Sequence, residues 1–262
     1  MLLGVNVVKR NEIYNHVLKE FGSNISDYSE NIDISGPFVP HVLKRYETAQ
    51  PKYFYCGQDT YWWVPYARFI TASKTDRLDD YLVENDKWLS LENIKDHSGN
   101  KAGSFWTLVI RLHLFLRTQR LYALSEIYSA EDEILQEIGW GNINAVEVPK
   151  SLQNEGRWDS LDHDTYWKIK DKSRPLDSMK LLLDAFKPDV VFIFNWDSSK
   201  ESDVFRGLDA TEDLSKSVPG LLAIYSIAGY DTKIVWCPHP NNLRYKSQNI
   251  EGLIRLIAAA LA

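Results

Sequence analysis

The chain has 262 residues, of which 44% are hydrophobic and 25% are charged, a balance typical of one globular domain with a sizeable core. Its net charge of −6, from 30 basic and 36 acidic side chains, argues against a protein that coats nucleic acid non-specifically, because phosphate contacts need clustered lysines and arginines. No apolar run approaches the length of a membrane span and no export signal is visible, so we expect a cytoplasmic protein without membrane contact.

Apolar residues at helical spacing predict helices along most of the chain. Ser129 and the acids that follow it are typical of a capped helix start, and Gly139 of a helix end. The helices are predicted, in chain order, over 12–21, 39–46, 104–124, 129–139, 175–186, 211–216 and 250–261.

Four short apolar runs with high strand propensity lie between these helices. They cover residues 52–56, 139–148, 189–195 and 233–237. Their alternation with helices predicts an α/β fold: a three-layer α/β/α sandwich with a small, mostly parallel four-stranded central sheet.

Residues 1–262 are expected to form a single domain with two insertions. The first, near 76–100, is charged, and we expect an exposed insertion with one helix. The second, near 149–174, is long and polar, which is typical of a lid or a disordered insert.

The two cysteines, Cys56 and Cys237, fall within predicted strands, so we expect buried, reduced thiols. Two cysteines cannot supply the four ligands of an iron–sulfur cluster. The histidines show no paired spacing typical of a zinc site. We therefore expect no metal and no cofactor.

Polar residues follow three of the predicted strands. Gln58 and Asp59 come after the first strand, Asn142 and Asn144 lie toward the end of the second, and His239 follows the last. Ligands bind at the carboxyl ends of strands in open α/β sheets, so these residues are candidates for one site. Plainer interpretations are that Asp59 is a solvated acid, that Asn144 caps a turn and that His239 is a histidine in a proline-rich loop.

Three short motifs resemble those of the uracil-DNA glycosylase superfamily. Residues 57–61, Gly-Gln-Asp-Thr-Tyr, resemble its Gly-Gln-Asp-Pro-Tyr motif. Residues 144–146, Asn-Ala-Val, resemble its base-reading motif, and residues 239–243, His-Pro-Asn-Asn-Leu, resemble its His-Pro-Ser-Pro-Leu motif. The motifs occur in this order, each after a predicted strand, and the resemblance covers about residues 36–260.

The chemistry of base excision assigns roles to these residues. Breaking an N-glycosidic bond leaves positive charge on the deoxyribose and negative charge on the base. A carboxylate such as Asp59 stabilises the sugar cation and orients water, and a donor such as His239 stabilises the departing base at O2. The resemblance implies that Asn144 reads the base edge, with Asn142 as its rival, and that Gln58 and Tyr61 line the base.

The residues after His239 are candidates for contacts with DNA, our expected partner; protein partners are not predicted. Leu243 suits a wedge that fills the gap left by a flipped base, although packing in the core is the alternative. Arg244, Asn241 and Asn242 suit contacts with the DNA backbone. Aromatic residues that could stack on the base are Trp62, Trp63, Tyr66, Phe105 and Trp158.

Departures from the family pattern bear on the substrate. Thr60 replaces the proline that precedes the tyrosine matched by Tyr61, which in the uracil enzymes lies against C5 of the base. The amide of Asn144 does not itself distinguish uracil from cytosine, because rotation of the amide by a half-turn exchanges its donor and acceptor and matches it to cytosine. We therefore expect a bulky 5-substituted cytosine, such as glucosylated hydroxymethylcytosine, as removed from viral DNA by antiphage members of the superfamily.

Three other functions are alternatives to this one, and the sequence disfavours two of them. Excision of uracil in DNA repair is the nearest alternative. A non-catalytic module that binds a modified base is disfavoured, because binding alone needs neither Asp59 nor His239. A nucleotide-binding metabolic enzyme is disfavoured by the lack of a glycine-rich phosphate loop after any predicted strand.

Overall fold

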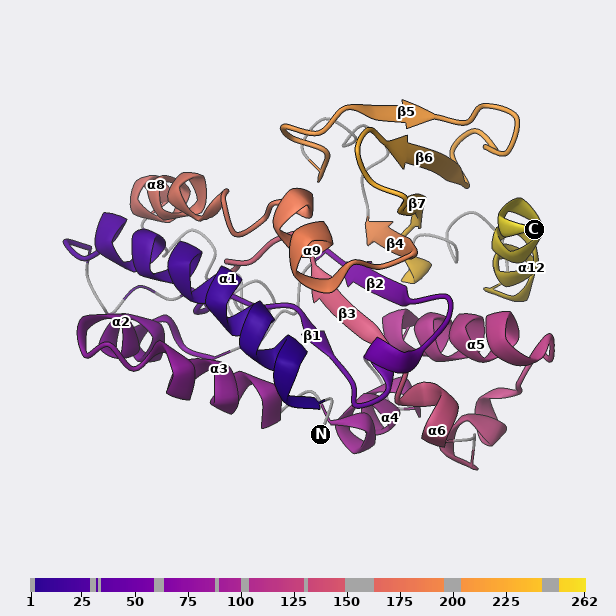
Figure 1. The fold of residues 1–262 in the computed structure, drawn as a ribbon, viewed down its shortest axis with the longest axis horizontal. Helices are drawn as coiled ribbons and strands as arrows, with labels where there is room; N and C mark the ends of the chain where they lie inside the picture. The colour runs from indigo at the N-terminus through magenta and orange to yellow at the C-terminus, as the bar shows by residue number, and fades with distance from the viewer. Residues whose placement is uncertain are drawn as a thin grey trace. The chain divides into compact units, whose positions relative to one another are not determined.

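The structure is a computed structural model, and it describes residues 3–28, 32, 34–58, 64–87, 90–99, 104–129, 132–148, 163–195, 204–241 and 250–262. The chain divides into two compact units, whose elements are labelled in Figure 1. The helical unit comprises Met1–Pro40, Asp59–Trp88 and Gly141–Phe186. The sheet unit comprises His41–Gln58, Leu89–Trp140 and Lys187–Ala262.

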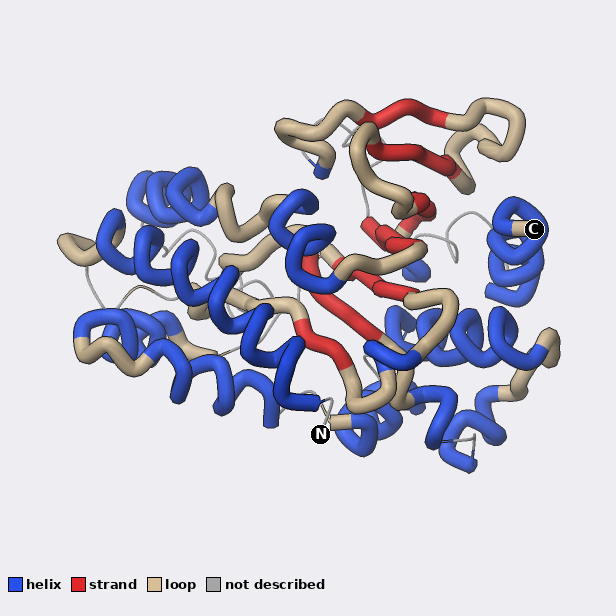
Figure 2. The backbone as a smooth tube through the Cα atoms, in the orientation of Figure 1, coloured by secondary structure: helices blue, strands red, loops and turns tan. Residues whose placement is uncertain are grey.

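The sheet unit is built on a mixed sheet of seven strands in the order β1-β3-β2-β4-β7-β6-β5, drawn in red in Figure 2. Strands β2, β4 and β7 pair in parallel, and the pairs β1–β3, β6–β7 and β5–β6 are antiparallel. The strands are β1 (His41–Val42), β2 (Tyr53–Gly57), β3 (Gly139–Asn142), β4 (Val190–Asn195), β5 (Ala210–Glu212), β6 (Ala223–Ile227) and β7 (Lys233–Pro238).

The α/β class is confirmed, but the prediction of a four-stranded, mostly parallel sheet is wrong. The four predicted strands are four neighbours in the sheet, β3-β2-β4-β7, and β1, β5 and β6 extend it at both edges. Residues 39–46 and 211–216 were predicted as helices, yet β1 and β5 fall there. Pairing of His41 with Trp140 and of Ala210 with Ile227 fixes these short edge strands, and local sequence carries no signal for such pairing.

Helix α5 (Ser104–Thr118) is the central helix of the sheet unit, and its residues 107–115 are all buried. A helix that is buried on every side is typical of a core. It packs against β2, α4 and α6, and α12 lies beside it (Figure 1). The other helices described in this unit are α4 (Leu91–Gly99), α6 (Asp132–Leu135), α12 (Ile250–Leu261) and the 3₁₀ turns η1 (Tyr46–Thr48) and η2 (Leu124–Ser129).

The helix predictions in this unit differ in outcome. The helix over 250–261 is confirmed as α12, and the helix from residue 104 is confirmed but ends at Thr118. The helix predicted over 129–139 is reduced to the single turn α6, because Gly139 begins β3 instead of ending a helix. A β-carbon at Gly139 would come within 2.6 Å of the Phe54 ring, so only glycine allows this close approach to β2.

Aromatic side chains fill the core between α5 and the parallel strands. The Tyr55 and Phe192 rings stack with centroids 5.0 Å apart, and Phe194 continues the stack 6.4 Å from Phe192. Phe105 of α5 meets Phe194 edge-on at 6.0 Å. Each buried ring contributes about 2–3 kcal/mol from burial, and this packing holds β2 and β4 in register where their carboxyl ends carry candidate site residues.

The helical unit is organised around α1 (Leu3–Asn24), which packs against the four other helices that the structure describes in this unit. Tyr14 lies against Phe186 with ring centroids 6.2 Å apart, and Phe21 stacks on Phe69 at 5.5 Å. The other helices are α2 (Tyr66–Lys74), α3 (Leu78–Lys87), α8 (His163–Ser173) and α9 (Met179–Phe186).

Helices occur in both segments that were predicted to be insertions. Residues 76–100 contain two helices, α3 and α4, and the apolar side chains Leu78, Tyr81 and Leu82 of α3 are buried in the core of the helical unit. Helix α8 lies in the polar segment 149–174, whose first part, 149–162, is outside the described residues. The predicted three-layer arrangement needs the placement of one unit on the other and stays a prediction.

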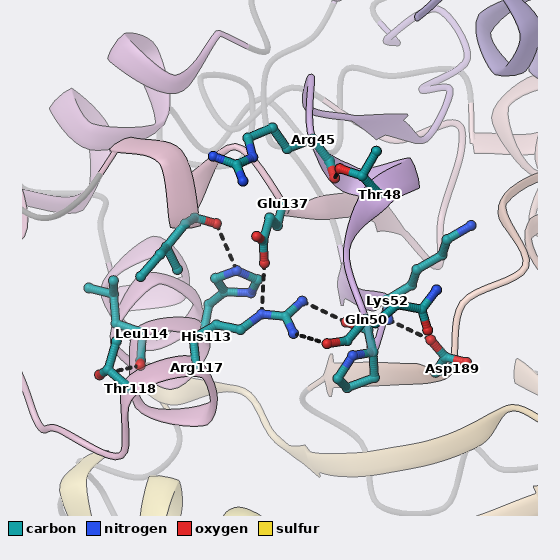
Figure 3. A network of polar contacts seen from close by, with 12 residues as sticks. Arg45, Thr48, Gln50, Lys52, His113, Leu114, Arg117, Thr118, Glu137 and Asp189 are labelled. Carbon is teal, nitrogen blue, oxygen red and sulfur yellow. Dashed lines mark hydrogen bonds and ion pairs between the residues drawn. The ribbon is translucent and has the colours of Figure 1, made fainter. Parts of the chain in front are cut away.

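Arg117, near the end of α5, fixes the approach to β2 (Figure 3). Its guanidinium donates to the carbonyls of Gln50 and Pro51 at 2.8 and 2.6 Å, and its Nε lies 2.8 Å from Oε2 of Glu137. The Nε–Oε2 contact is an ion pair whose alignment is poor for a hydrogen bond. The guanidinium also lies 4.7 Å from the centre of the Tyr53 ring, so one side chain ties α5 to the start of β2.

Two further contacts hold β2, of which Figure 3 draws the one between Lys52 and Asp189. Nε2 of the buried His113 donates to the Ile134 carbonyl at 3.0 Å, and Nδ1 accepts from the Tyr55 hydroxyl at 3.0 Å. Burial lowers the pKa of His113 to about 3, so the ring is neutral, as these two bonds require. The backbone N–H of Lys52 donates to the Asp189 carboxylate at 2.6 Å, which links the starts of β2 and β4.

We expect Arg117→Met to lower the free energy of unfolding by about 3 kcal/mol, the lower end of the range for buried pairs, because it leaves the 16% exposed Glu137 carboxylate without its counter-charge. The matched control is Arg120→Met: Arg120 is 59% exposed against 13% for Arg117, and its ion pair with Glu126 is at the surface. That control should cost less than about 1 kcal/mol. Urea denaturation of the two variants makes the comparison, and equal losses would contradict a structural role for Arg117.

Candidate functional site

Three parallel strands end at one edge of the sheet and carry the candidate residues of the sheet unit. Strand β4 lies between β2 and β7, with Cys56 opposite Ile193 and Asn195 opposite Pro238. Gln58 follows β2 and His239 follows β7, so both leave the sheet at this edge. Strands are spaced by about 4.8 Å, which places the ends of β2 and β7 about 10 Å apart. The edge is of the kind at which α/β proteins bind ligands.

His239 is held in a fixed position at the end of β7. Its backbone N–H donates to the carbonyl of Asn195 at 2.7 Å, and its Nδ1 accepts the backbone N–H of Asn241 at 3.3 Å. Pro238 and Pro240 flank it and restrict the backbone on both sides. The half-buried imidazole is therefore oriented by main-chain contacts as well as by packing.

The protonation state of His239 follows from these contacts. Burial lowers its pKa to about 4, so the ring is neutral at pH 7. A neutral imidazole carries one proton, and Nδ1 accepts from Asn241, so the proton lies on Nε2. His239 thus presents an uncharged Nε2–H donor, which suits the stabilisation of negative charge that develops on an oxygen.

Asn195 is a residue at this edge that the sequence prediction did not single out. It is 1% exposed, its Oδ1 accepts the indole N–H of Trp236 at 3.0 Å, and its carbonyl accepts the N–H of His239. It therefore ties β4 to β7 beside the histidine. Its only signal in the sequence is that an amide side chain follows an otherwise apolar run, and we interpreted Asn195 only as the last residue of the predicted strand.

The end of β2 is described only as far as Gln58, which is half-buried. Asp59 and Tyr61 lie outside the described residues, so their predicted roles stay predictions. Cys56 and Cys237, one residue inside the ends of β2 and β7, are free and buried, and burial raises the pKa of both thiols. The prediction of buried, reduced cysteines is confirmed.

Asn144 lies in a loop of the helical unit, because β3 ends at Asn142 and not at residue 148 as predicted. The loop is bound to residues 35–38: the N–H of Phe38 donates to the Ala145 carbonyl at 2.6 Å, and the N–H of Ser35 donates to the Glu147 carbonyl at 2.8 Å. Asn144 and Asn142 are both half-buried. The two rivals for base reading therefore differ in setting, one in a strand and one in an anchored loop.

The candidates for contact with DNA lie mostly outside the described residues. Asn241 is half-buried, and its N–H orients His239. Asn242, Leu243 and Arg244 are outside the described residues, so the wedge and phosphate contacts stay predictions.

The aromatic residues predicted to stack on the base are likewise only partly among the described residues. Tyr66 is 1% exposed and belongs to the core of the helical unit, so the prediction that it stacks on a base is wrong. Phe105 is half-buried against Phe194. Trp62, Trp63 and Trp158 are outside the described residues.

Within the described ranges, no group of three His, Cys, Asp or Glu side chains is placed to hold a metal ion. None of the helices in those ranges is long and apolar enough to span a membrane. Comparison of the chain with family models, with curated proteins and with solved structures gives no match.

Proposed function

We propose that the protein is a monofunctional DNA glycosylase, which flips a modified pyrimidine out of the helix and hydrolyses its N-glycosidic bond. The proposal rests on the three motifs and their order in the sequence, and on the neutral, oriented imidazole of His239 at the carboxyl edge of β7. We place the protein in the uracil-DNA glycosylase superfamily on the same grounds, as a cytoplasmic enzyme without cofactor or metal.

The observation that carries the proposal is the contact of the Asn241 N–H with Nδ1 of His239, which assigns the ring proton to Nε2. As the bond between C1′ and the base nitrogen breaks, its electron pair passes to the base, and negative charge builds on O2. A neutral Nε2–H donor stabilises that charge without first taking a proton from water, and Asn241 holds the ring in the required tautomer. A donor of this kind contributes typically a hundredfold or more to the rate.

The opposite charge, on the sugar, is assigned to Asp59. Its carboxylate stabilises the cation at C1′ and orients the water whose oxygen becomes bonded to C1′; the proton that this water loses passes through solvent to the nitrogen of the departing base anion, which leaves as the neutral base. Asp59 follows Gln58 directly, and Gln58 leaves the sheet at the edge where His239 also leaves it. The products are the free base and an abasic site.

Base selection is assigned to Asn144, with Gln58 and Tyr61 as further contacts. The favoured substrate is a cytosine with a bulky 5-substituent, such as glucosylated hydroxymethylcytosine of phage DNA, because Thr60 departs from the family pattern beside the tyrosine that faces C5. Antiphage defence is the biological role that fits such a substrate. Uracil is the alternative base.

The proposal is tested by product analysis. The protein is incubated with DNAs that carry uracil, hydroxymethylcytosine or glucosylated hydroxymethylcytosine. Released base is then identified by mass, and abasic sites are counted with an aldehyde-reactive probe. Release of one of these bases with an equal number of abasic sites is expected. Tight binding of modified DNA without release would instead identify a non-catalytic base-binding module.

We expect the reaction to leave an uncleaved abasic site, because no lysine lies in the three motifs to form a Schiff base with the sugar. Product strands should break only after alkali or a second enzyme is added. Borohydride should trap no protein on the DNA, and a stoichiometric covalent adduct on a denaturing gel would show that the monofunctional assignment is wrong.

We expect the His239 imidazole to titrate near pH 4 and not near the usual 6.5, because burial disfavours its charged form. Above pH 5 the ring should stay neutral, and its protonation should contribute nothing to the pH dependence of base release. The ring resonances of labelled protein, assigned by comparison with His239→Gln, give the midpoint. A midpoint above pH 7 would leave the ring mostly charged at pH 7 and would remove the neutral donor from the mechanism.

A further inference from the structure

The loop that carries Asn144 is held by a carboxylate from a distant part of the helical unit. Oδ1 of Asp177 accepts the backbone N–H of Ala145 at 2.6 Å, so it binds the peptide unit that joins Ala145 to Asn144. On the other side of the same residue, the Ala145 carbonyl accepts the N–H of Phe38 at 2.6 Å. Ala145 is thus fixed at both its donor and its acceptor, and Asn144 directly precedes it.

Asp177 is itself rigidly placed. It lies in the turn between α8 and α9, where its N–H donates to the carbonyl of Arg174 at 3.2 Å. Its Oδ2 pairs with Nζ of Lys170 at 3.2 Å, and the side chain is only 18% exposed. Burial raises the pKa of Asp177, and Lys170 opposes that rise. A carboxylate in such a place costs free energy unless it is well paired, and here it is paired with a cation and a main-chain donor.

We propose that Asp177 is a positioning residue for Asn144, which sets the orientation of the base-reading amide through the Ala145 peptide, with Lys170 holding the carboxylate in place. The inference rests on the proposed function, because it takes Asn144 to be the base reader. A side chain held in this way selects a base by geometry, and an error of about 1 Å in its position can reduce the rate about a hundredfold. Asp177 touches neither base nor sugar in this account.

The first test is independent of DNA. Asp177→Ala removes the acceptor, whereas Asp177→Asn keeps a carbonyl oxygen that can accept the Ala145 N–H. Asp171→Ala is the matched control, because Asp171 is an exposed acid of α8 that pairs with Arg174. Amide hydrogen exchange should accelerate at Ala145 at least tenfold in Asp177→Ala and stay within about threefold of wild type in the other two. Unchanged exchange in Asp177→Ala would overturn the inference whatever the protein does to DNA.

The second test uses the base found to be released by the wild type. Single-turnover release should fall about 10- to 100-fold in Asp177→Ala, be largely restored in Asp177→Asn and be unaffected in Asp171→Ala. Asn144→Ala and the Asn144→Ala/Asp177→Ala double variant should be equally slow, because Asp177 acts through Asn144. All variants should bind a duplex with a tetrahydrofuran abasic analogue as the wild type does, because that duplex has no base to read.

The outcomes separate the positioning role of Asp177 from the proposed glycosylase function. Losses that multiply in the double variant, or weaker binding of the tetrahydrofuran duplex in Asp177→Ala, would show that Asp177 acts on the unit as a whole and would overturn the inference. Release of no base by the wild type, or full activity of Asn144→Ala, would instead overturn the proposed function or the role of its base reader, and the exchange measurement would still report on the anchor.

Discussion

Replacing His239 by alanine is expected to reduce the rate of base release about a hundredfold or more while the protein stays folded. The variant removes the Nε2–H donor that the Asn241 N–H and the prolines on either side hold in place. Loss of one pre-organised donor to a developing oxyanion costs about that much in other enzymes. The effect should fall on the single-turnover rate and not on the affinity for DNA, because the charge on the base develops only in the transition state.

Two further variants control this prediction. His239→Gln keeps an N–H donor on a more flexible side chain and should retain more activity than His239→Ala. His16→Ala removes an exposed histidine of α1 and should behave as the wild type. Single-turnover rates and melting curves of the three proteins make the comparison. Wild-type rates from a folded His239→Ala protein would exclude the histidine from the chemistry.

Asp59→Asn is expected to be at least as damaging, with a loss of a hundredfold or more, because it removes the carboxylate assigned to the sugar cation and to the attacking water. Asparagine has nearly the same size and keeps a hydrogen-bonding carbonyl, so the fold should be retained. Asp27→Asn, at an exposed acid of the helical unit, is the matched control. A folded Asp59→Asn protein that forms abasic sites at the wild-type rate would show that another group does this work.

The elements that sequence reasoning predicted well are those whose signal is local and long. Strands β4 and β7 are continuous apolar runs, and α12 has a regular apolar face, so their bounds are close to the prediction. By contrast, β1 has two residues and β5 three, too few for a period to show. These edge strands exist because partners distant in the sequence pair with them, and such pairing is a tertiary effect that local propensity does not contain.

In the candidate site too, residues with a local sequence signal were predicted, and residues whose role depends on tertiary contacts were missed. The order of strand ends gave Gln58, Asn144 and His239 as candidates, since a polar residue after an apolar strand can be recognised from the sequence. Asn195 and Asp177 were missed because their roles depend on contacts. Asn195 is recognised only from its bond to the Trp236 indole, and Asp177 only from its bond to Ala145, across 32 positions of sequence.

The central claim, hydrolysis of an N-glycosidic bond, is tested most directly by the fate of the water oxygen. The reaction is run in water enriched in oxygen-18 with DNA that carries glucosylated hydroxymethylcytosine or uracil, and both products are analysed by mass after borohydride reduction of the sugar. The account predicts an unlabelled free base and one heavy oxygen on C1 of the abasic sugar, with neither product formed by His239→Ala at a comparable rate. A label on the base, or DNA recovered with every base still attached, would contradict it.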